Sequence, residues 1–308
     1  MQNDLLDKKH DGAIFQLDGK LAMSTDTYVV SPIFFEGGDI GDLAVNGTVN
    51  DLAMCGASAK YLTLGFVLEE GLAMAEFWQV LLSIKAACEK ASVQIITGDT
   101  KVVERGKGDK IFINTTGVGQ VVGKANIDIE NIKAGDKIIL SGPLARHGIT
   151  IMSHRQGLQF ETTISSDTRP LKNIVIDLIN EFGEKIHFLR DPTRGGLATV
   201  LNEIAIDSKL GIDISQKNIP VEEEVEGACE MLGLDPLYVA NEGLFVAVVD
   251  NSIAEVFLQR IKEWEHGTMA SMVGQVRTDH PKQVLMKSNI GGRRVVNMLA
   301  GEQLPRIC

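Results

Sequence analysis

The chain has 308 residues, of which 44% are hydrophobic and 23% charged, and its formal net charge is −11. This composition is typical of a globular protein with two domains or one large one, and it excludes intrinsic disorder. Because the chain is acidic and has no stripe of Lys or Arg, we expect no nucleic acid partner.

The first half of the chain alternates between strand and helix patterns. Helical spacing covers residues 38–57 and, most clearly, 74–91, where apolar side chains recur every three or four positions. β-Branched residues and alternating apolar positions predict strands over residues 21–30, 60–68, 93–97 and 110–122. The strand at 93–97 is expected to end at Gly98 and Asp99.

The second half mixes the same two patterns from a turn at Gly135 and Asp136 onward. Helices are predicted near 148–155, 168–182, 196–208, 221–232 and 252–264, and strands near 211–215, 244–250, 270–276 and 283–287. We therefore predict an α+β protein with mixed sheets in two domains, 1–135 and 136–298. Residues 299–308 have no periodic face and are predicted to form a flexible tail.

Three aspartates in the first domain are candidate metal ligands. Asp26, Asp51 and Asp99 are expected at the ends of strands or helices, among small or polar residues. Carboxylate oxygens suit Mg²⁺ shared with nucleotide phosphates, and Asn46 and Asn50 are candidates to add neutral oxygens or to orient the carboxylates. The alternative for each Asp is a cap or turn residue.

Other candidates are dispersed along the chain. Lys101 follows Asp99 and is either a phosphate or proton-transfer group or a solvated loop residue. Asp191 or Thr193 could cap a helix beginning at Arg194, whose N-terminus would favour anions.

Two further side chains stand in glycine-containing turns. Glu242 precedes an apolar strand and is either a base or a turn residue. For His147, which precedes Gly148, a packing or capping role is favoured over a catalytic one.

The last residue of the chain is a cysteine. Cys55, Cys88, Cys229 and Cys308 include no CxxC pair, which favours reduced thiols over disulfides or structural zinc. A terminal thiol has free access and no packing role, so Cys308 is either a carrier nucleophile or a surface thiol without a task. The polar N-terminus and the lack of an apolar run of about 20 residues predict a cytoplasmic protein with no signal peptide and no membrane span.

The motifs together resemble the HypE family of hydrogenase maturation proteins. They run from about Met23 to Cys308: STDTYVVSPIFFEGGDIGDLAVNGTVNDLAMCGA, LGFVLEEGL, TGDTKVV, RDPTRGG, VANEG and the terminal PRIC. The first sets are shared with a wider superfamily that includes aminoimidazole ribonucleotide synthetase, selenophosphate synthetase and thiamine-phosphate kinase, whereas PRIC is specific.

The resemblance implies a fold and an activity. First domains would pair in a homodimer around a β-barrel-like core, with ATP and Mg²⁺ bound near that interface. Cys308 would accept a carbamoyl group from a HypF-like carbamoyltransferase. ATP-dependent dehydration would turn this group into a thiocyanate, whose cyanide passes to iron on a HypC–HypD-like complex.

The resemblance also implies roles for the candidate residues. Asp26, Asp51 and Asp99 would hold the metal. Asn46, Asn50, Thr100, Asp191 and Arg194 would join these aspartates in binding the nucleotide. Glu242 is the first candidate for the base that removes the N–H protons, and Lys101 is the second.

One segment departs from the family pattern. Members usually begin with a glycine-rich stretch containing HGSGG, whereas this sequence enters the TDTY strand by residue 25. The absence of this stretch keeps a non-catalytic assembly partner in maturation open as an alternative. A small-molecule phosphotransferase or synthetase of the same superfamily is a second alternative.

Overall fold

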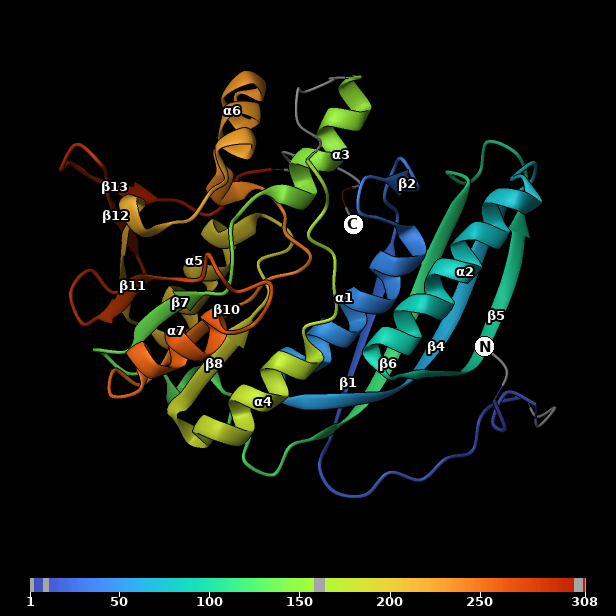
Figure 1. Ribbon diagram of the computed structural model, residues 1–308, viewed down its shortest axis with the longest axis horizontal. Coiled ribbons are helices and arrows are strands. Elements are labelled where there is room, and N and C mark those ends of the chain that lie inside the picture. Colours follow the sequence, from blue (N-terminus) through green and yellow to red (C-terminus); the bar gives the residue numbers. More distant parts are fainter. Residues whose placement is uncertain (1–2, 8–10, 158–163, 302–306, 308) are drawn as a thin grey trace.

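The computed structural model describes residues 3–7, 11–157, 164–301 and 307. The first domain is a four-stranded sheet in the order β1-β6-β4-β5, with two helices packed on one face (Figure 1). Strand β4 is antiparallel to β6 and parallel to β5. The elements are β1 (Leu21–Tyr28), α1 (Ile40–Met54), β4 (Ala57–Glu69), α2 (Met74–Ala91), β5 (Gln94–Val103) and β6 (Ile111–Val121), with a small ladder of β2 (Phe34–Phe35) and β3 (Gly38–Asp39).

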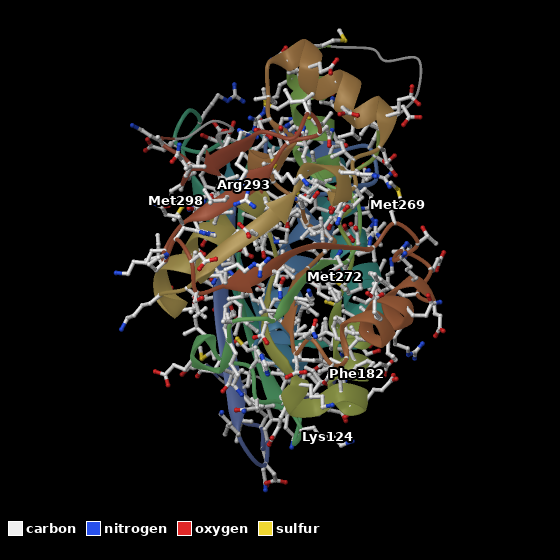
Figure 2. The ribbon with its side chains drawn as sticks, turned by 90° about the vertical axis from the view of Figure 1, so that its left-hand side faces the viewer. Lys124, Phe182, Met269, Met272, Arg293 and Met298 are labelled. Atoms are coloured by element: carbon white, nitrogen blue, oxygen red, sulfur yellow. The ribbon has the colours of Figure 1, made fainter. Side chains whose placement is uncertain are left out.

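The second domain is a seven-stranded mixed sheet in the order β13-β12-β9-β11-β7-β10-β8. Figure 2 shows this side of the molecule, with Met272 of β11 near the middle, Arg293 on the outermost strand and Phe182 at the end of α4. Its strands are β7 (Lys137–Leu140), β8 (Ile186–Arg190), β9 (Gly211–Ser215), β10 (Val246–Val249), β11 (Ser271–Arg277), β12 (Val284–Lys287) and β13 (Arg293–Val296). Its helices are α3 (Arg146–Gln156), α4 (Lys172–Phe182), α5 (Gly196–Ser208), α6 (Glu223–Leu232) and α7 (Ala254–Lys262).

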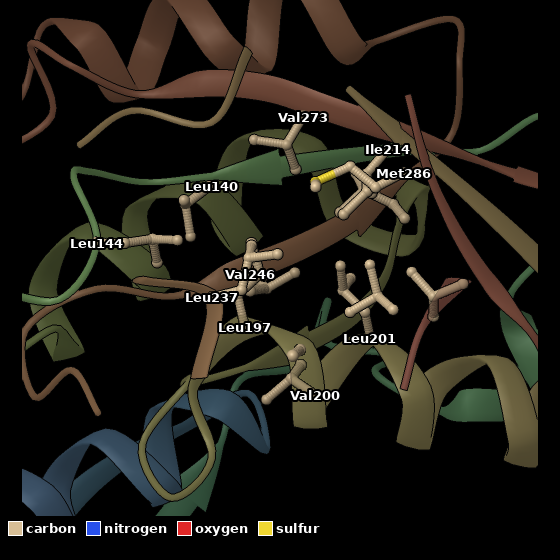
Figure 3. Close-up of a cluster of buried hydrophobic side chains, with 14 of the residues drawn as sticks. Leu140, Leu144, Leu197, Val200, Leu201, Ile214, Leu237, Val246, Val273 and Met286 are labelled. Carbon is tan, nitrogen blue, oxygen red and sulfur yellow. The ribbon is translucent and has the colours of Figure 1, made fainter. Parts of the chain in front are cut away.

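Helices cover both faces of the second sheet because its central strands alternate between two apolar cores. Leu140 and Val246 join the cluster around α5, in which Leu197 and Leu201 are also packed (Figure 3). Ile139 and Ala247 face the opposite cluster, which contains α4 and α7. Central strands that are buried on both sides read as continuous apolar runs, such as IIL and VAVV.

The prediction of a mixed α+β fold is confirmed, with local differences. The short strands β2 and β3 and the strands β8 and β13 were not predicted, and β5 does not end at Gly98 but continues to Val103. Its neighbour β4 also runs on to Glu69, and the two strands stay in parallel register past Gly98. The close pairing requires a glycine at position 98, because a Cβ atom there would collide with the backbone oxygen of Leu64.

Candidate functional site

Four acidic side chains from both domains influence one another at the domain junction. Asp26 lies in β1 and Asp51 in the last turn of α1, whereas Asp191 directly follows β8 and Glu242 precedes β10. The charges of Asp26, Asp51 and Asp191 all raise the pKa of Glu242. We call these four residues the carboxylate site.

Glu242 is the most deeply buried member of the site. Its side chain is 4% exposed, and its Oε1 atom has no hydrogen-bond partner. Burial is the main cause that raises its pKa well above the usual range, and the neighbouring carboxylates, first Asp167 and then Asp191, add to it. A buried carboxylate oxygen without a partner is costly, so a cation or a proton donor is the expected occupant.

Asp191 and Asp51 show the same repulsion. Burial, and next the charge of Asp51, raises the pKa of Asp191 to about 7. Burial also raises the pKa of Asp51, although Ser24 Oγ donates a 2.6 Å hydrogen bond to its carboxylate. Arg190 is the cation that lowers both values, and it does not cancel the effect of burial.

Hydrogen bonds to Asp167 hold the loop that carries Glu242. The Asp167 carboxylate accepts hydrogen bonds from the backbone N–H groups of Glu242 (3.2 Å) and Gly243 (2.9 Å). Gly243 has no room for a side chain, because a Cβ atom would collide with the Asp167 carbonyl oxygen. Asp167 was not among the predicted site residues, since an Asp in a Ser-rich stretch is typical of a turn.

Both asparagines of α1 donate hydrogen bonds to the second domain, and Asn46 also donates to Asp42 of α1 itself at 3.1 Å. Asn50 Nδ2 donates to the carbonyl oxygens of Arg169 (3.0 Å) and Glu242 (3.3 Å), and its Oδ1 accepts from Leu171 N–H (2.7 Å). Asn46 Nδ2 donates to Thr168 Oγ1 at 3.2 Å, and its Oδ1 is buried without a partner. Both side chains therefore orient the loops that form the carboxylate site.

Asp99 lies away from the carboxylate site of its own chain. Across the sheet, Asp26 pairs with Thr115, Thr115 with Leu64, and Leu64 with Gly98, the neighbour of Asp99. The edge strands β1 and β5 are therefore three strand spacings apart, about 14 Å. Asp99 Oδ2 is 2.9 Å from Lys101 Nζ and accepts the Thr100 N–H through its other oxygen. These side chains are exposed on β5, within the strand rather than at its end.

Helix α5 begins at Gly196, in agreement with the predicted range 196–208, and not at Arg194. Gly195, in the left-handed region at φ 72°, is the N-cap, and no side chain caps the helix. Asp191 and Thr193 are therefore not caps: Asp191 is buried in the carboxylate site, and Thr193 contributes a backbone turn to Gly196. Arg194 is exposed.

The chain end approaches the junction from the side of α3. Cys308 lies outside the described residues, but Ile307 is 3% exposed and its carbonyl oxygen is 2.8 Å from His147 Nε2. His147 is fully buried within α3, in agreement with its predicted packing role.

Other features of the described residues lie elsewhere. Asp136, His187 and Asp250 form a group of potential metal ligands, but Asp136 already accepts hydrogen bonds from His187 Nδ1 and from Lys133 N–H, both at 2.7 Å. A cavity of about 800 Å³ is lined by Lys60, Tyr61, Cys88 and Ile95, among others, and contains none of the four carboxylates. No described helix has the length and apolar character needed to cross a membrane.

Comparison with known proteins identifies the family. The N-terminal domain of AIR synthase related proteins matches residues 9–121, and the C-terminal domain of the same proteins matches residues 133–287. The carbamoyl dehydratase HypE of Azotobacter vinelandii is 48% identical over all of this chain and 90% of its own length.

Solved structures agree with this assignment. A crystal structure of hydrogenase maturation protein HypE in complex with ATP superposes with a TM-score of 0.96 at 48% identity, covering 99% of this chain and 92% of that one. The HypE–HypF complex matches with a TM-score of 0.88 at 43% identity, covering 96% of each chain. The chain therefore belongs to the HypE family of AIR synthase related proteins.

Proposed function

We propose that this protein uses ATP to dehydrate a carbamoyl group carried on Cys308 to a thiocyanate, which supplies cyanide for the iron of [NiFe]-hydrogenase. The observation that carries the proposal is the carboxylate site, where the Glu242 Oε1 atom is unpaired and the charges of Asp167, Asp191, Asp26 and Asp51 all raise the pKa of Glu242. The 48% identity of this chain to the carbamoyl dehydratase HypE of Azotobacter vinelandii supports the same function.

The reaction needs a leaving group and a base. The amide oxygen of the carbamoyl group leaves poorly, and transfer of the γ-phosphoryl group of ATP to this oxygen allows it to depart as phosphate. Two N–H protons are lost as the nitrile forms. Glu242 is the proposed base, because its raised pKa makes the ionised carboxylate a strong proton acceptor. Lys101 remains the second candidate.

The residues of the carboxylate site fit Mg²⁺. Glu242 Oε1 lacks a partner, and hard carboxylate oxygens are the ligands that Mg²⁺ prefers. Asp26, Asp51 and Asp191 are the Mg²⁺ ligands that we propose one copy of the chain supplies. Bound there, Mg²⁺ would neutralise phosphate charge during phosphoryl transfer. In this proposal Asn46 and Asn50 act by holding the loops beside the nucleotide, while Arg194 and Thr100 contact it.

Asp99 is proposed to complete the site of a second copy. Strands β1 and β5 are the two edges of the first sheet, so one chain keeps Asp26 and Asp99 about 14 Å apart. Met23 on β1 and Val102 on β5 are 72% and 68% exposed, which suits edges that are covered in a homodimer. Pairing of first domains into a barrel-like core would bring β5 of one copy to β1 of the other.

The first experiment is an intact-mass measurement. After carbamoylation of Cys308, addition of MgATP should lower the mass by one water. The Cys308→Ser variant should accept no carbamoyl group, whereas Cys55→Ser, which removes an exposed thiol at the end of α1, should behave as wild type. Glu242→Gln should bind ATP and keep the carbamoyl group intact. A carbamoylated wild-type chain that binds ATP without losing water would contradict the proposal.

The second experiment tests the shared site by complementation. Asp26→Asn and Asp99→Asn homodimers should each be inactive. If each site combines Asp26 of one copy with Asp99 of the other, a mixed dimer contains one intact site and one doubly altered site. Subunit exchange should then restore about a quarter of wild-type activity, because half of the dimers are mixed and each has one of two sites. No recovery after verified exchange would assign both residues to the same chain or to no common site.

The wider assignment concerns partners and location. We propose a HypF-like carbamoyltransferase as the donor, which the HypE–HypF crystal structure supports, and a HypC–HypD-like complex as the acceptor of cyanide. We also propose a cytoplasmic location, because the proposed reaction consumes ATP.

A further inference from the structure

His147 has a defined tautomer, because each ring nitrogen has a different kind of partner. Nε2 is 2.8 Å from the carbonyl oxygen of Ile307, which can only accept, so Nε2 carries the hydrogen. Nδ1 is then the acceptor for Ser166 Oγ at 2.8 Å, and this hydroxyl in turn accepts the N–H of Thr168. Burial lowers the pKa of His147, which keeps the ring neutral and suited to this network.

Ile307 is held by its side chain as well as by its carbonyl group. It belongs to the apolar cluster of the first domain, together with Phe35 of β2 and Ile151 of α3. The ring of Phe35 also packs edge-on against the His147 ring, with centroids 5.5 Å apart. Figure 1 shows β2 and α3 side by side above the first turn of α1. The residue before the terminal cysteine is therefore buried, with one hydrogen bond to His147 and with its side chain in this apolar cluster, and we call these surroundings its pocket.

The pocket is joined to the loop that carries Glu242. Gly148 N–H donates to the Ala240 carbonyl oxygen at 3.1 Å, and Asn241 Oδ1 accepts from the N–H of Ala145 at 2.7 Å. A Cβ atom at Gly148 would collide with Val239, so glycine is what allows α3 to approach this loop. Ser166, the hydrogen-bond partner of His147, directly precedes Asp167, whose carboxylate accepts the backbone N–H of Glu242.

We propose that His147 and Ser166 form a docking site for the chain end, which binds Ile307 and thereby positions the thiol-bearing Cys308 beside the carboxylate site. His147 is a positioning residue: it contacts the tail backbone and not the reacting atoms. The consequence for catalysis rests on the proposed function, whereas the docking itself can be measured without ATP or a carbamoyl group. A chain end held at Ile307 would present a small substrate on Cys308 in one place.

Docking is tested by trypsin cleavage of the bond between Arg306 and Ile307. The protease needs this bond extended in its own active site, so Ile307 must leave its pocket first. Loss of the buried hydrogen bond in His147→Leu should accelerate release of the Ile–Cys dipeptide roughly tenfold, as measured by intact mass. His147→Gln, which retains an N–H donor near the Nε2 position, should stay closer to wild type. Cleavage at the exposed Lys107 provides an internal reference.

A second pair of variants keeps the test independent of folding around His147. Ile307→Ala lies at the chain end and should also accelerate dipeptide release, whereas Ile290→Ala, at a side chain 97% exposed, should not. Equal cleavage rates for wild type, His147→Leu and Ile307→Ala, all folded by circular dichroism, would overturn the docking site.

The catalytic consequence has a separate readout. In single-turnover dehydration of S-carbamoylated protein, His147→Leu should lower the rate constant at saturating ATP and leave the KM for ATP unchanged. A raised KM for ATP with unchanged cleavage would instead assign His147 to the nucleotide. Accelerated cleavage with no dehydration in any variant, including wild type, would retain docking and refute the proposed function.

Discussion

Replacement of Asp191 by Asn should stabilise the protein at neutral and alkaline pH while removing its response to Mg²⁺. Asp191 is 8% exposed, and burial, followed by the charge of Asp51, raises its pKa from 3.8 to about 7. Between these two values the folded state holds a proton that the unfolded state releases. The contribution of Asp191 to stability is therefore most favourable below pH 3.8 and is lost as the pH rises to about 7.

The magnitude follows from the width of this window. A shift of about three pKa units corresponds to about 4 kcal/mol of unfavourable free energy above pH 7. Between pH 5 and pH 8 the change is about 2.5 kcal/mol, because part of the loss has already occurred by pH 5. The difference in free energy of unfolding between Asp191→Asn and wild type should grow by up to this amount over that range.

Urea denaturation at pH 5 and pH 8, with and without Mg²⁺, measures these quantities. Wild type should gain stability from Mg²⁺ at pH 8, when Asp191 is ionised, and little at pH 5; Asp191→Asn should gain little at either pH. Asp207→Asn is the matched control, since Asp207 is exposed on α5. The reasoning is refuted if the gap between Asp191→Asn and wild type is independent of pH, or if Mg²⁺ stabilises both proteins equally.

Three other substitutions test contacts that hold the first domain together or join it to the second. Lys172 Nζ donates to two backbone carbonyl groups of the first domain and has its pKa lowered to about 8 by burial, so the melting temperature of wild type should rise relative to Lys172→Met between pH 8 and 10.5. Gly98→Ala should cost about 3 kcal/mol or more in urea denaturation, because its Cβ would collide with the Leu64 carbonyl oxygen. Gly65→Ala, whose Cβ would have no neighbour closer than 3.7 Å, is its control and should be tolerated. Asn50→Ala should cost about 2–4 kcal/mol and loosen the junction, seen as faster hydrogen exchange at Leu171.

Most of the fold could be predicted from hydrophobic periodicity, and the misses have local causes. Strand β8 (IHFLR) is five residues long and contains His and Arg, so its apolar signal is weak. Strand β13 (RRVV) is an edge strand whose arginines are exposed, as edges often require. The end of β5 was misplaced because Gly-Asp is a frequent turn pair, whereas here the glycine serves a close approach to β4.

The acidic residues of the site could be named from their motifs, but their grouping could not. Asp191 and Glu242 were predicted in separate roles, yet burial and proximity make them one electrostatic unit with Asp51. Such proximity depends on how two domains meet, which no local pattern encodes. The contact between His147 and Ile307 spans 160 residues and was invisible for the same reason.

The carboxylate site divides evenly between the domains, and this division links cation binding to the domain junction. Asp26 and Asp51 belong to the first domain, whereas Asp191 and Glu242 belong to the second. Their mutual repulsion therefore opposes the contact between domains, and the Asn50 and Lys172 hydrogen bonds act against that repulsion. A bound cation would reverse the sign of the electrostatic contribution. Substitutions that loosen the junction should for that reason weaken Mg²⁺ affinity without touching a ligand, because the contact between the domains is what keeps the two pairs of carboxylates side by side.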